Sequence, residues 1–390
     1  MRWSFRIATI LGIPVKIHLT FLILLPLFAW IFAFQNFHVL VFDTAFGVLA
    51  FDTGFGGVDL SFLASPIDDA VRWTLGSLAA IFFFASVLFH ELVHSYVAIR
   101  YGATISGITL IIFGGISEIE DIPRQPAAER NMALAGPATN FLIAGVGYAV
   151  LLVLAPFRTL STGLEVLTVF FSILVFYNLI LGLFNLIPAF PMDGGRVLRA
   201  SLARNRSYIS ATETAATVGK VFAVLFAVVG ILTFQFILIL IAAFVYMGAG
   251  GEAQLTKLTV ALEGVYVDDI MTKEVDTVTS DSTVAELMER IAVERHMGYP
   301  VVNGEVRGLV TFQDAVAVPP DRRDRVRVGD ISSKKIVTIE PRAQALDAMK
   351  RISDRKIGRL LVMDGGQLVG ILTRTDLVRA VSIYQAQRGL

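Results

Sequence analysis

Long apolar segments dominate the first part of the chain and constrain its fold more than any other feature. Charged residues are few from Leu19 to about Met247, whereas after about Glu252 the sequence is an ordinary mixture of charged and apolar residues. Over all 390 residues, 17% are charged, against about 25% in an ordinary soluble domain. Since a helix needs about 20 apolar residues to cross the hydrocarbon core of a bilayer, the first part is predicted to be an all-α membrane bundle.

Six membrane spans are expected, and the soluble part is expected to begin within Gly248–Glu263. The spans are predicted near Leu19–Phe34, Val71–Arg100, Asn131–Leu154, Leu164–Ile187, Thr214–Thr233 and Phe234–Met247. The last two share one apolar stretch that only Thr-Phe-Gln at residues 233–235 interrupts. The boundary between these two spans is therefore left open.

The positions of Lys and Arg predict the orientation of the spans. Basic residues precede the first span and follow the second and fourth, whereas the loop after the first span is mainly acidic. The basic residues are Arg2, Arg6, Lys16, Arg100, Arg124, Arg130, Arg196, Arg199, Arg204 and Arg206, and the acidic ones are Asp43, Asp52, Asp59, Asp68 and Asp69. Because cytoplasmic loops carry an excess of Lys and Arg, we expect a multi-pass protein of the cell membrane. Its N-terminus, its C-terminal part and the access to its active site are expected on the cytoplasmic side.

The composition excludes several kinds of site. The chain has no cysteine, so that disulfides and thiolate metal ligands are ruled out, and any metal must be held by His, Asp or Glu. The formal net charge is zero, which gives no electrostatic reason to expect a nucleic-acid partner.

Two histidines and a glutamate lie inside the second predicted span. His90-Glu91-Leu92-Val93-His94 fits the pattern H-E-x-x-H, in which the two histidines share one helix face and can bind one zinc ion. Glu91 would lie close enough to accept a proton from a water at that ion. A histidine pair that is merely part of the core is the alternative. Ionisable side chains are expensive within a bilayer when unpaired, which favours the metal site.

A third ligand must come from elsewhere, because catalytic zinc usually keeps three protein ligands and one open position. Asp193 follows the fourth span in the segment Asn-Leu-Ile-Pro-Ala-Phe-Pro-Met-Asp-Gly-Gly-Arg, residues 185–196. The prolines and glycines around it break the helix and let an aspartate face inward. A simple surface turn is the alternative, since Asp and Gly are common in turns. Considered together with the H-E-x-x-H pattern, Asp193 is favoured as the third ligand.

The loop between the second and third spans has the pattern of a β-hairpin. Residues 105–123 alternate β-branched and small residues around Gly114-Gly115. The apolar character of this loop suggests that it turns back toward the membrane as a re-entrant segment. Such backbone is tolerated at membrane depth only where it is buried in protein or lines a wet cavity.

The soluble part contains an internal repeat. Residues 267–291 match residues 328–352, and each copy continues with the pattern strand, strand, helix. Two such α/β units are expected to pack against each other as one module.

The paired membrane motifs resemble the site-2 protease family of intramembrane zinc metalloproteases. The supporting segments are Gly-Ile-Pro-Val-Lys-Ile-His-Leu-Thr-Phe (residues 12–21), Phe-Gly-Gly-Ile-Ser (113–117) and Gly-Pro-Ala-Thr-Asn (136–140). The C-terminal repeats resemble tandem CBS domains, of the cystathionine-β-synthase type. The resemblance implies a membrane protease domain at residues 1–250, and CBS repeats at 264–318 and 325–384.

The resemblance also implies roles for particular residues. His90, His94 and Asp193 would bind one Zn²⁺, and Glu91 would be the general base and acid. Asn185 would donate a hydrogen bond to the developing oxyanion. The hairpin at Gly114 and Gly115 would present a strand edge to the substrate. Asn140 would bind the substrate backbone or brace the helices.

CBS domains use a Thr and an Asp to hold the ribose of an adenine nucleotide. The matching residues are Thr311 and Asp314 in the first copy, and Thr373, Thr375 and Asp376 in the second. The second copy fits better, because Gln313 replaces the Thr that should precede the first Asp. An aspartate that only caps its helix is the alternative, as is a module that serves only to form a homodimer.

The leading prediction is an intramembrane zinc endopeptidase that cuts membrane-anchored proteins within or near their transmembrane helices. Its partners would be the lipid bilayer and a substrate with a transmembrane helix. A CBS-regulated transporter or channel with a structural metal is the alternative, although the sequence lacks the internal symmetry typical of transporters. A catalytically inert scaffold that zinc stabilises is a third possibility. The presence of Glu91 argues against it, because a scaffold does not need this residue.

Overall fold

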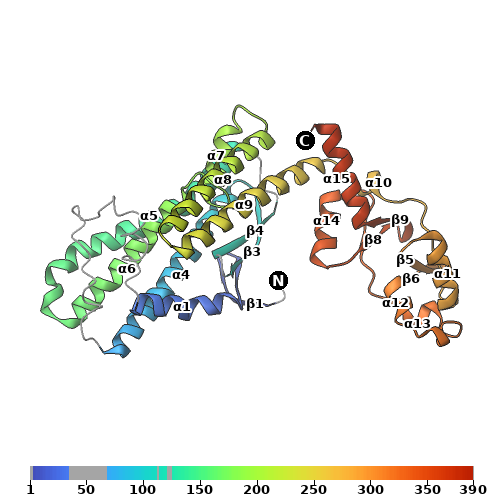
Figure 1. Ribbon diagram of the computed structural model, residues 1–390, viewed down its shortest axis with the longest axis horizontal. Helices are drawn as coiled ribbons and strands as arrows, with labels where there is room; N and C mark the ends of the chain where they lie inside the picture. Colours follow the sequence, from blue (N-terminus) through green and yellow to red (C-terminus); the bar gives the residue numbers. More distant parts are fainter. Residues whose placement is uncertain (1–2, 35–67, 112–113, 121–124, 390) are drawn as a thin grey trace. The chain divides into compact units, whose positions relative to one another are not determined.

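The computed structural model describes residues 3–34, 68–111, 114–120 and 125–389. It divides into two compact units, Met1–Gln254 and Leu255–Leu390, whose elements are labelled in Figure 1. Five residues that contribute to the predicted orientation lie outside the described residues: Arg2, Asp43, Asp52, Asp59 and Arg124.

Five helices of the described residues are long and apolar enough to cross a membrane. They are α4 (Asp69–Arg100), α5 (Pro126–Leu154), α6 (Thr162–Asn185), α8 (Tyr208–Leu232) and α9 (Phe236–Ala261). α1 (Phe21–Phe34) is apolar but shorter, so that a sixth span stays a prediction. α8 and α9 are separate helices that flank residues 233–235.

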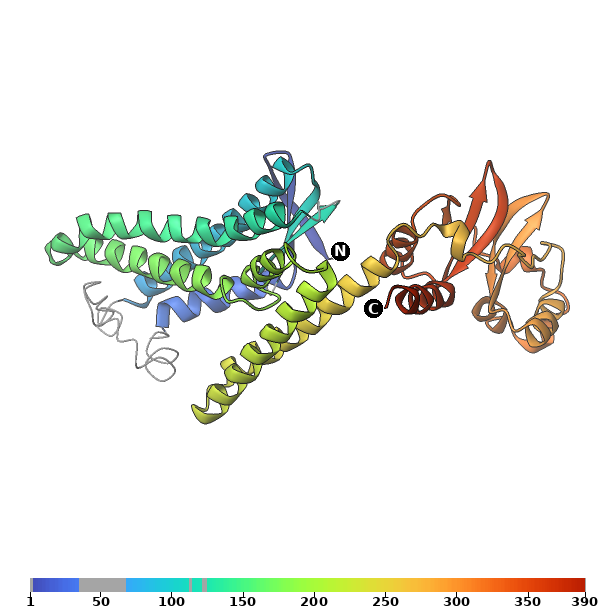
Figure 2. The same cartoon turned by 90° about the horizontal axis from the view of Figure 1, so that it is seen from above.

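Small residues let the membrane helices approach one another closely. A Cβ atom on Gly76 of α4 would lie 2.3 Å from the Ala29 backbone oxygen of α1 and 2.9 Å from the Ala33 Cβ atom. Such contacts drive helix association in lipid, where the surrounding tails are as apolar as the side chains. In Figure 2, α5 and α6 lie side by side along α4, joined by the 3-10 helix η1 (Ala155–Leu160).

A four-stranded sheet lies at one end of these helices. It consists of β1 (Ser4–Ile10), β2 (Ile13–His18), β3 (Thr104–Ile111) and β4 (Gly114–Glu120), in that order. β3 and β4 form the antiparallel hairpin expected from the sequence, and β2 pairs with β3 in parallel. The addition of two N-terminal strands was not predicted, because it depends on pairing between segments about 90 residues apart in the chain.

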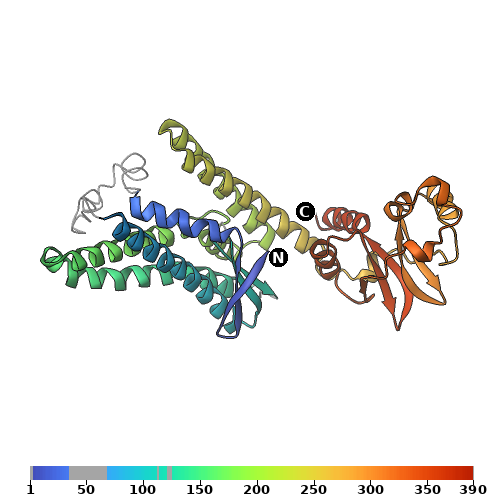
Figure 3. The same ribbon diagram turned by 90° about the horizontal axis from the view of Figure 1, so that it is seen from below.

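The segment between α6 and α8 is held by small residues of the last two membrane helices. It contains residues 186–192 and the short helix α7 (Asp193–Leu202). Phe190 is fully buried and packs with Ala215 and Ala216 of α8 and Ala249 of α9. Figure 3 shows α8 and α9 as a pair of neighbouring helices. This packing fixes the place at which α7 begins, and hence the position of Asp193.

The second unit contains the two repeats. The first comprises α10 (Val267–Ile270), α11 (Val284–Glu294), β5 (Gly298–Asn303), β6 (Glu305–Thr311), α12 (Phe312–Val316) and the 3-10 helix η2 (Pro320–Arg322). The second comprises α13 (Val328–Ile331), β7 (Thr338–Ile339), α14 (Ala345–Asp354), β8 (Arg359–Asp364), β9 (Gln367–Thr373) and α15 (Arg374–Arg388). Bridges Thr272–Ile371 and Leu309–Ser333 join each repeat to the other, so that the two form one module.

Candidate metal centre and active site

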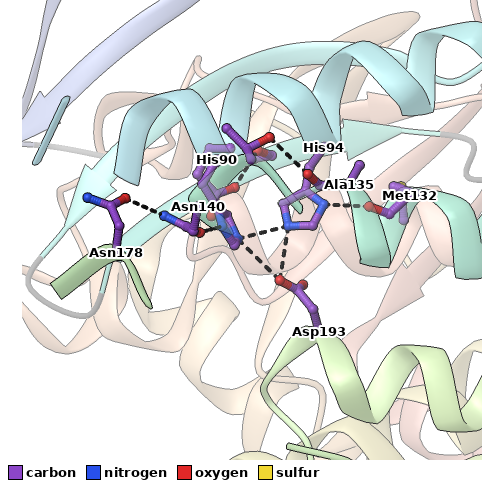
Figure 4. A network of polar contacts seen from close by, with 10 residues as sticks. His90, His94, Met132, Ala135, Asn140, Asn178 and Asp193 are labelled. Carbon is purple, nitrogen blue, oxygen red and sulfur yellow. Dashed lines mark hydrogen bonds and ion pairs between the residues drawn. The ribbon is translucent and has the colours of Figure 1, made fainter. Parts of the chain in front are cut away.

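Three donor atoms from two distant segments meet beside α4. The Nε2 atoms of His90 and His94 lie 3.0 Å apart, and Asp193 Oδ2 lies 3.2 Å from the first and 3.0 Å from the second. Figure 4 shows both rings turned toward the carboxylate at the start of α7. Both histidines are buried, at 5% and 8% exposure. The structure therefore brings together the three residues that the sequence suggested as metal ligands.

The outer nitrogen of each histidine ring has its own partner. His94 Nδ1 lies 2.6 Å from the Met132 backbone oxygen, and His90 Nδ1 lies 2.5 Å from Asn140 Oδ1. Because a carbonyl oxygen only accepts hydrogen bonds, His94 must carry its proton on Nδ1. In the neutral ring, Nε2 then keeps the lone pair that a metal would use, and this atom faces Asp193 Oδ2 at 3.0 Å. Metal-binding histidines are commonly fixed in this way by a second partner.

The space beside the two histidine donor atoms is kept open by Gly136 of α5. A Cβ atom at this position would lie 2.2 Å from His94 Nε2 and 2.5 Å from His90 Nε2. Those lengths are close to the zinc–nitrogen bond of about 2.0–2.1 Å, for which tetrahedral ligands lie about 3.3 Å apart. The donor set, its spacing and this gap fit a small tetrahedral cation.

A second group of metal-ligand residues lies in the first repeat and is less suited to a cation. Asp276, Glu294 and His296 have ligand atoms close together, but Asp276 and His296 are exposed. The Arg290 guanidinium already pairs with Glu294 at 2.7 Å and with Asp276 at 3.7 Å. A positive charge is thus present in this group without a metal.

Glu91 is in contact with the hairpin strand β4. The Ser117 hydroxyl donates a hydrogen bond of 2.9 Å to Glu91 Oε2, and Ser95 Oγ donates to Ser117 Oγ at 3.2 Å. A Cβ atom on Gly115 would lie 2.3 Å from Glu91 Cγ, so that only glycine permits this approach. The sequence drew attention to Gly114 and Gly115 but not to Ser117, although Ser117 belongs to the same Phe-Gly-Gly-Ile-Ser motif.

The two asparagines that the sequence pointed to occupy different positions. Asn140 is fully buried and contacts His90 and Asn178, while its role in substrate binding stays a prediction. Asn185 is the last residue of α6 and is half-buried. Its side chain makes no hydrogen bond to any of the described residues, and its role toward an oxyanion also stays a prediction.

A buried arginine supports the helix that begins at Asp193. Arg199 donates from Nε to Glu129 of α5 and from Nη1 to Glu252 of α9, each at 2.7 Å, and its guanidinium lies over the rings of Phe190 and Tyr208. Burial alone would lower the pKa of Arg199, but the two carboxylates outweigh it and raise the pKa. From the sequence, Arg199 was considered only as one of several cytoplasmic arginines.

In the CBS module, the predicted Thr and Asp residues cap helices. Thr311 and Asp314 form a capping box at α12, with 2.6 Å between Thr311 Oγ1 and Asp314 Oδ2. Thr373 and Asp376 do the same at α15, and Thr375 is exposed. The helix-capping alternative therefore describes the contacts that these residues make.

A pocket of about 410 Å³ lies between the two repeats, beside Thr311. Its lining includes Gln313, Ser333, Lys335 and Arg359. Burial lowers the pKa of Arg359, and no carboxylate pairs with its guanidinium among the described residues. A larger pocket of about 890 Å³ is lined mainly by the second repeat, together with Asp268 and Met271 of the first, and neither Thr373 nor Asp376 lines it.

Comparison with known proteins identifies both parts of the chain. The model of peptidase family M50 matches residues 78–168 and 159–229, and the CBS domain model matches 267–321 and 328–383. A zinc metalloprotease of Methanocaldococcus jannaschii is 32% identical over 100% of this chain and 99% of its own length. The Mycobacterium tuberculosis protein Rip3 is 31% identical over 99% of this chain and 94% of its own.

Among solved structures, a site-2 protease from Methanocaldococcus jannaschii is 34% identical. The match covers 64% of this chain and 95% of that one, with a TM-score of 0.39. The full-length relationship to the curated relatives decides the assignment. The chain therefore belongs to the site-2 protease family of zinc metalloproteases, peptidase family M50, and carries a tandem pair of CBS domains.

Proposed function

We propose that the chain is an intramembrane zinc endopeptidase that hydrolyses peptide bonds within or near the transmembrane segments of membrane-anchored proteins. The convergence of His90, His94 and Asp193, with a gap at Gly136 beside the two histidines, carries this proposal. Glu91 adds an acid–base group on the same helix. Because the chain belongs to a protease family, the alternative of a CBS-regulated transporter or channel has no observation in its favour.

His90, His94 and Asp193 would hold the zinc ion through Nε2, Nε2 and Oδ2. When bound there, zinc would polarise the scissile carbonyl and acidify the attacking water. Glu91 takes the proton of that water and delivers it to the leaving amine. Ser117 engages Glu91 Oε2, which leaves Oε1 for the transferred proton. The half-buried amide of Asn185 is the donor proposed for the oxyanion.

Strand β4 is proposed to hold the substrate in an extended form. It is the last strand of its sheet, so that its outer edge faces away from β3, and its Gly115 and Ser117 touch Glu91. A transmembrane helix must unwind before its carbonyls can be attacked, and an added strand would hold the unwound segment by backbone hydrogen bonds. If a chain lacking residues 105–120 cleaved as well as the full chain, this role would be excluded.

We further propose six spans, with α1 as the first, and a hairpin that re-enters the membrane. The N-terminus and the CBS module would lie in the cytoplasm, as the charge distribution suggests. The CBS module would bind an adenine nucleotide that gates cleavage, and would form homodimers. The pocket beside Thr311 supports a nucleotide site at the first repeat, although the sequence motif favoured the second.

The decisive experiment compares the purified wild-type chain in detergent with Glu91→Gln. Candidate single-span proteins serve as substrates, and zinc content is measured in both samples. The wild type should cleave and lose activity with a chelator. The variant should bind zinc equally but cleave at least ~100-fold more slowly, since general acid–base catalysis contributes about 10²–10⁴-fold. Equal cleavage by both zinc-loaded proteins would refute the proposed function.

A further inference from the structure

We infer that Asn178, a residue of α6 that does not touch the metal centre, determines which nitrogen of His90 carries the proton. It acts through Asn140 of α5, so that three helices contribute to one hydrogen-bonded chain: α4, α5 and α6. The inference rests on the proposed function only in taking His90 Nε2 as a zinc donor. Asn178 is thus a positioning residue.

A backbone carbonyl fixes which group donates and which accepts at the Asn178 end of this series of hydrogen bonds. Asn178 Nδ2 lies 2.9 Å from the Leu174 backbone oxygen. A carbonyl can only accept, so the NH₂ group of Asn178 must face Leu174 and its Oδ1 must face the other way. Figure 4 shows that Asn140 lies on that side.

The same argument determines the donor and the acceptor in the hydrogen bond between Asn140 and His90. Asn178 Oδ1 accepts a hydrogen bond of 2.9 Å from Asn140 Nδ2. Asn140 Oδ1 is therefore the atom that faces His90 Nδ1, at 2.5 Å. Because this oxygen has no proton to donate, His90 Nδ1 must carry one. In the neutral ring, Nε2, which faces His94 Nε2 and Asp193 Oδ2, then keeps the lone pair.

Loss of Asn178 would remove the constraint on this polarity. Asn140 and Asn178 are both fully buried, at 0% exposure. An Asn140 amide with no partner on α6 could rotate and present Nδ2 to His90. That rotation would favour a proton on His90 Nε2, where it occupies the lone pair needed by a metal. His94 has no such dependence, since its Nδ1 faces a backbone carbonyl directly.

The test uses Asn178→Leu, which removes both polar groups and keeps a side chain branched at Cγ, and Asn178→Asp, which keeps an acceptor toward Asn140. Ser172→Ala is the matched control. Ser172 is buried on the same helix and donates to a backbone oxygen, that of Thr168, but it lies outside the chain that leads to His90.

Two readouts are measured on the full chain in detergent. Nitrogen NMR of the metal-free, histidine-labelled protein, at a pH at which the His90 ring is neutral, reports the protonated ring nitrogen. His90 is assigned through His90→Gln among the five histidines. Competition with a chromophoric chelator gives the zinc dissociation constant. Asn178→Leu should move the His90 proton toward Nε2 and weaken zinc binding about 10–100-fold, as expected for a partner behind a ligand. Asn178→Asp and Ser172→Ala should keep the wild-type tautomer.

An unchanged tautomer in Asn178→Leu, with zinc affinity equal to that of Ser172→Ala, would overturn the inference. If Asn178→Leu fails to fold, Asn178→Ser is measured in the same way, because its short side chain cannot bridge to Asn140. A wild-type protein that binds no zinc would refute the proposed function instead. The NMR readout would still decide whether Asn178 sets the tautomer.

Discussion

At the residue scale, the metal centre depends on the absence of a Cβ atom at Gly136 as much as on the ligands. The missing Cβ atom would lie 2.2 Å from His94 Nε2 and 2.5 Å from His90 Nε2. Neither ring can move away easily, because both Nδ1 atoms are held by hydrogen bonds. The motif Gly-Pro-Ala-Thr-Asn therefore serves the metal centre through its glycine as well as through its asparagine.

We predict that Gly136→Ala removes zinc binding while leaving the intrinsic stability of α5 intact or improved. Alanine is favoured over glycine within a helix by about 1 kcal/mol, so a simple propensity effect would stabilise the protein. The methyl group would instead fill the space between the histidines, and zinc content should fall at least ~10-fold by elemental analysis. The control is Gly145→Ala on the same helix, where a Cβ atom meets nothing within 4 Å. Equal zinc content in both variants would contradict this account.

Glu91 is held by a side chain from the hairpin, and this hydrogen bond should matter for turnover. We predict that Ser117→Ala lowers kcat about 10–100-fold with little change in KM, because a hydrogen bond to a charged group contributes about 1.5–3 kcal/mol. Ser117→Thr, which keeps the hydroxyl, should recover most of the loss. Ser95→Ala should have the smaller effect, since Ser95 reaches Glu91 only through Ser117. Steady-state kinetics on one substrate measure these effects. An unchanged kcat in Ser117→Ala would show that the hydrogen bond from Ser117 does not position Glu91 for catalysis.

At the element scale, α7 is held in place by one buried cation and two carboxylates. Arg199 pairs with Glu129, which is 4% exposed, and with Glu252. Removal of one partner from a buried pair costs about 3–5 kcal/mol, because the other charge stays buried without compensation. Since Asp193 is the first residue of α7, displacement of this helix would move the third metal ligand.

We predict that Arg199→Gln lowers both the melting temperature and the zinc affinity. The double variant with Glu129→Gln should recover part of the stability, since the uncompensated carboxylate is then removed. Arg196→Gln on the same helix is the control, because Arg196 takes part in no ion pair among the described residues. Thermal melts in detergent and chelator competition are the measurements. If Arg199→Gln had the same melting temperature and the same zinc affinity as Arg196→Gln, Arg199 would not hold α7 in place.

The elements that could be predicted from the sequence are those defined by local pattern. Apolar length indicated the membrane helices, the Gly114-Gly115 hairpin appeared as β3 and β4, and the H-E-x-x-H spacing placed two ligands on one face. Contacts between distant segments could not be predicted in this way. β1 and β2 join the sheet through pairing across about 90 residues, and Asn178 and Arg199 acquire their roles only through packing against other helices. A short polar side chain in an apolar helix gives little indication of which partner it will meet.

At the scale of the whole molecule, one chain joins a membrane unit to a module with a pocket between its repeats. Arg359 lines that pocket together with Lys335, and a Cβ atom on Gly298 would lie 2.3 Å from its Nη1. The guanidinium is packed against backbone, and burial lowers its pKa. An anionic ligand beside it would offset the cost of removing this charge from water. The phosphate of the adenine nucleotide that we propose for the CBS module is such an anion.

We predict that Arg359→Gln weakens binding of AMP or ATP about 10–100-fold, because a hydrogen bond to a charged group is worth about 1.5–3 kcal/mol. Titration calorimetry on the full chain in detergent measures the affinity. The control is Arg355→Gln, at an exposed position four residues before β8 begins at Arg359. The same nucleotide should alter the cleavage rate of the wild type but not that of Arg359→Gln, whereas both proteins should cleave equally without nucleotide. Binding that Arg359→Gln leaves unchanged would place the nucleotide elsewhere in the module. If the wild type bound the nucleotide without any change in its cleavage rate, the pocket would bind nucleotide but would not regulate the protease.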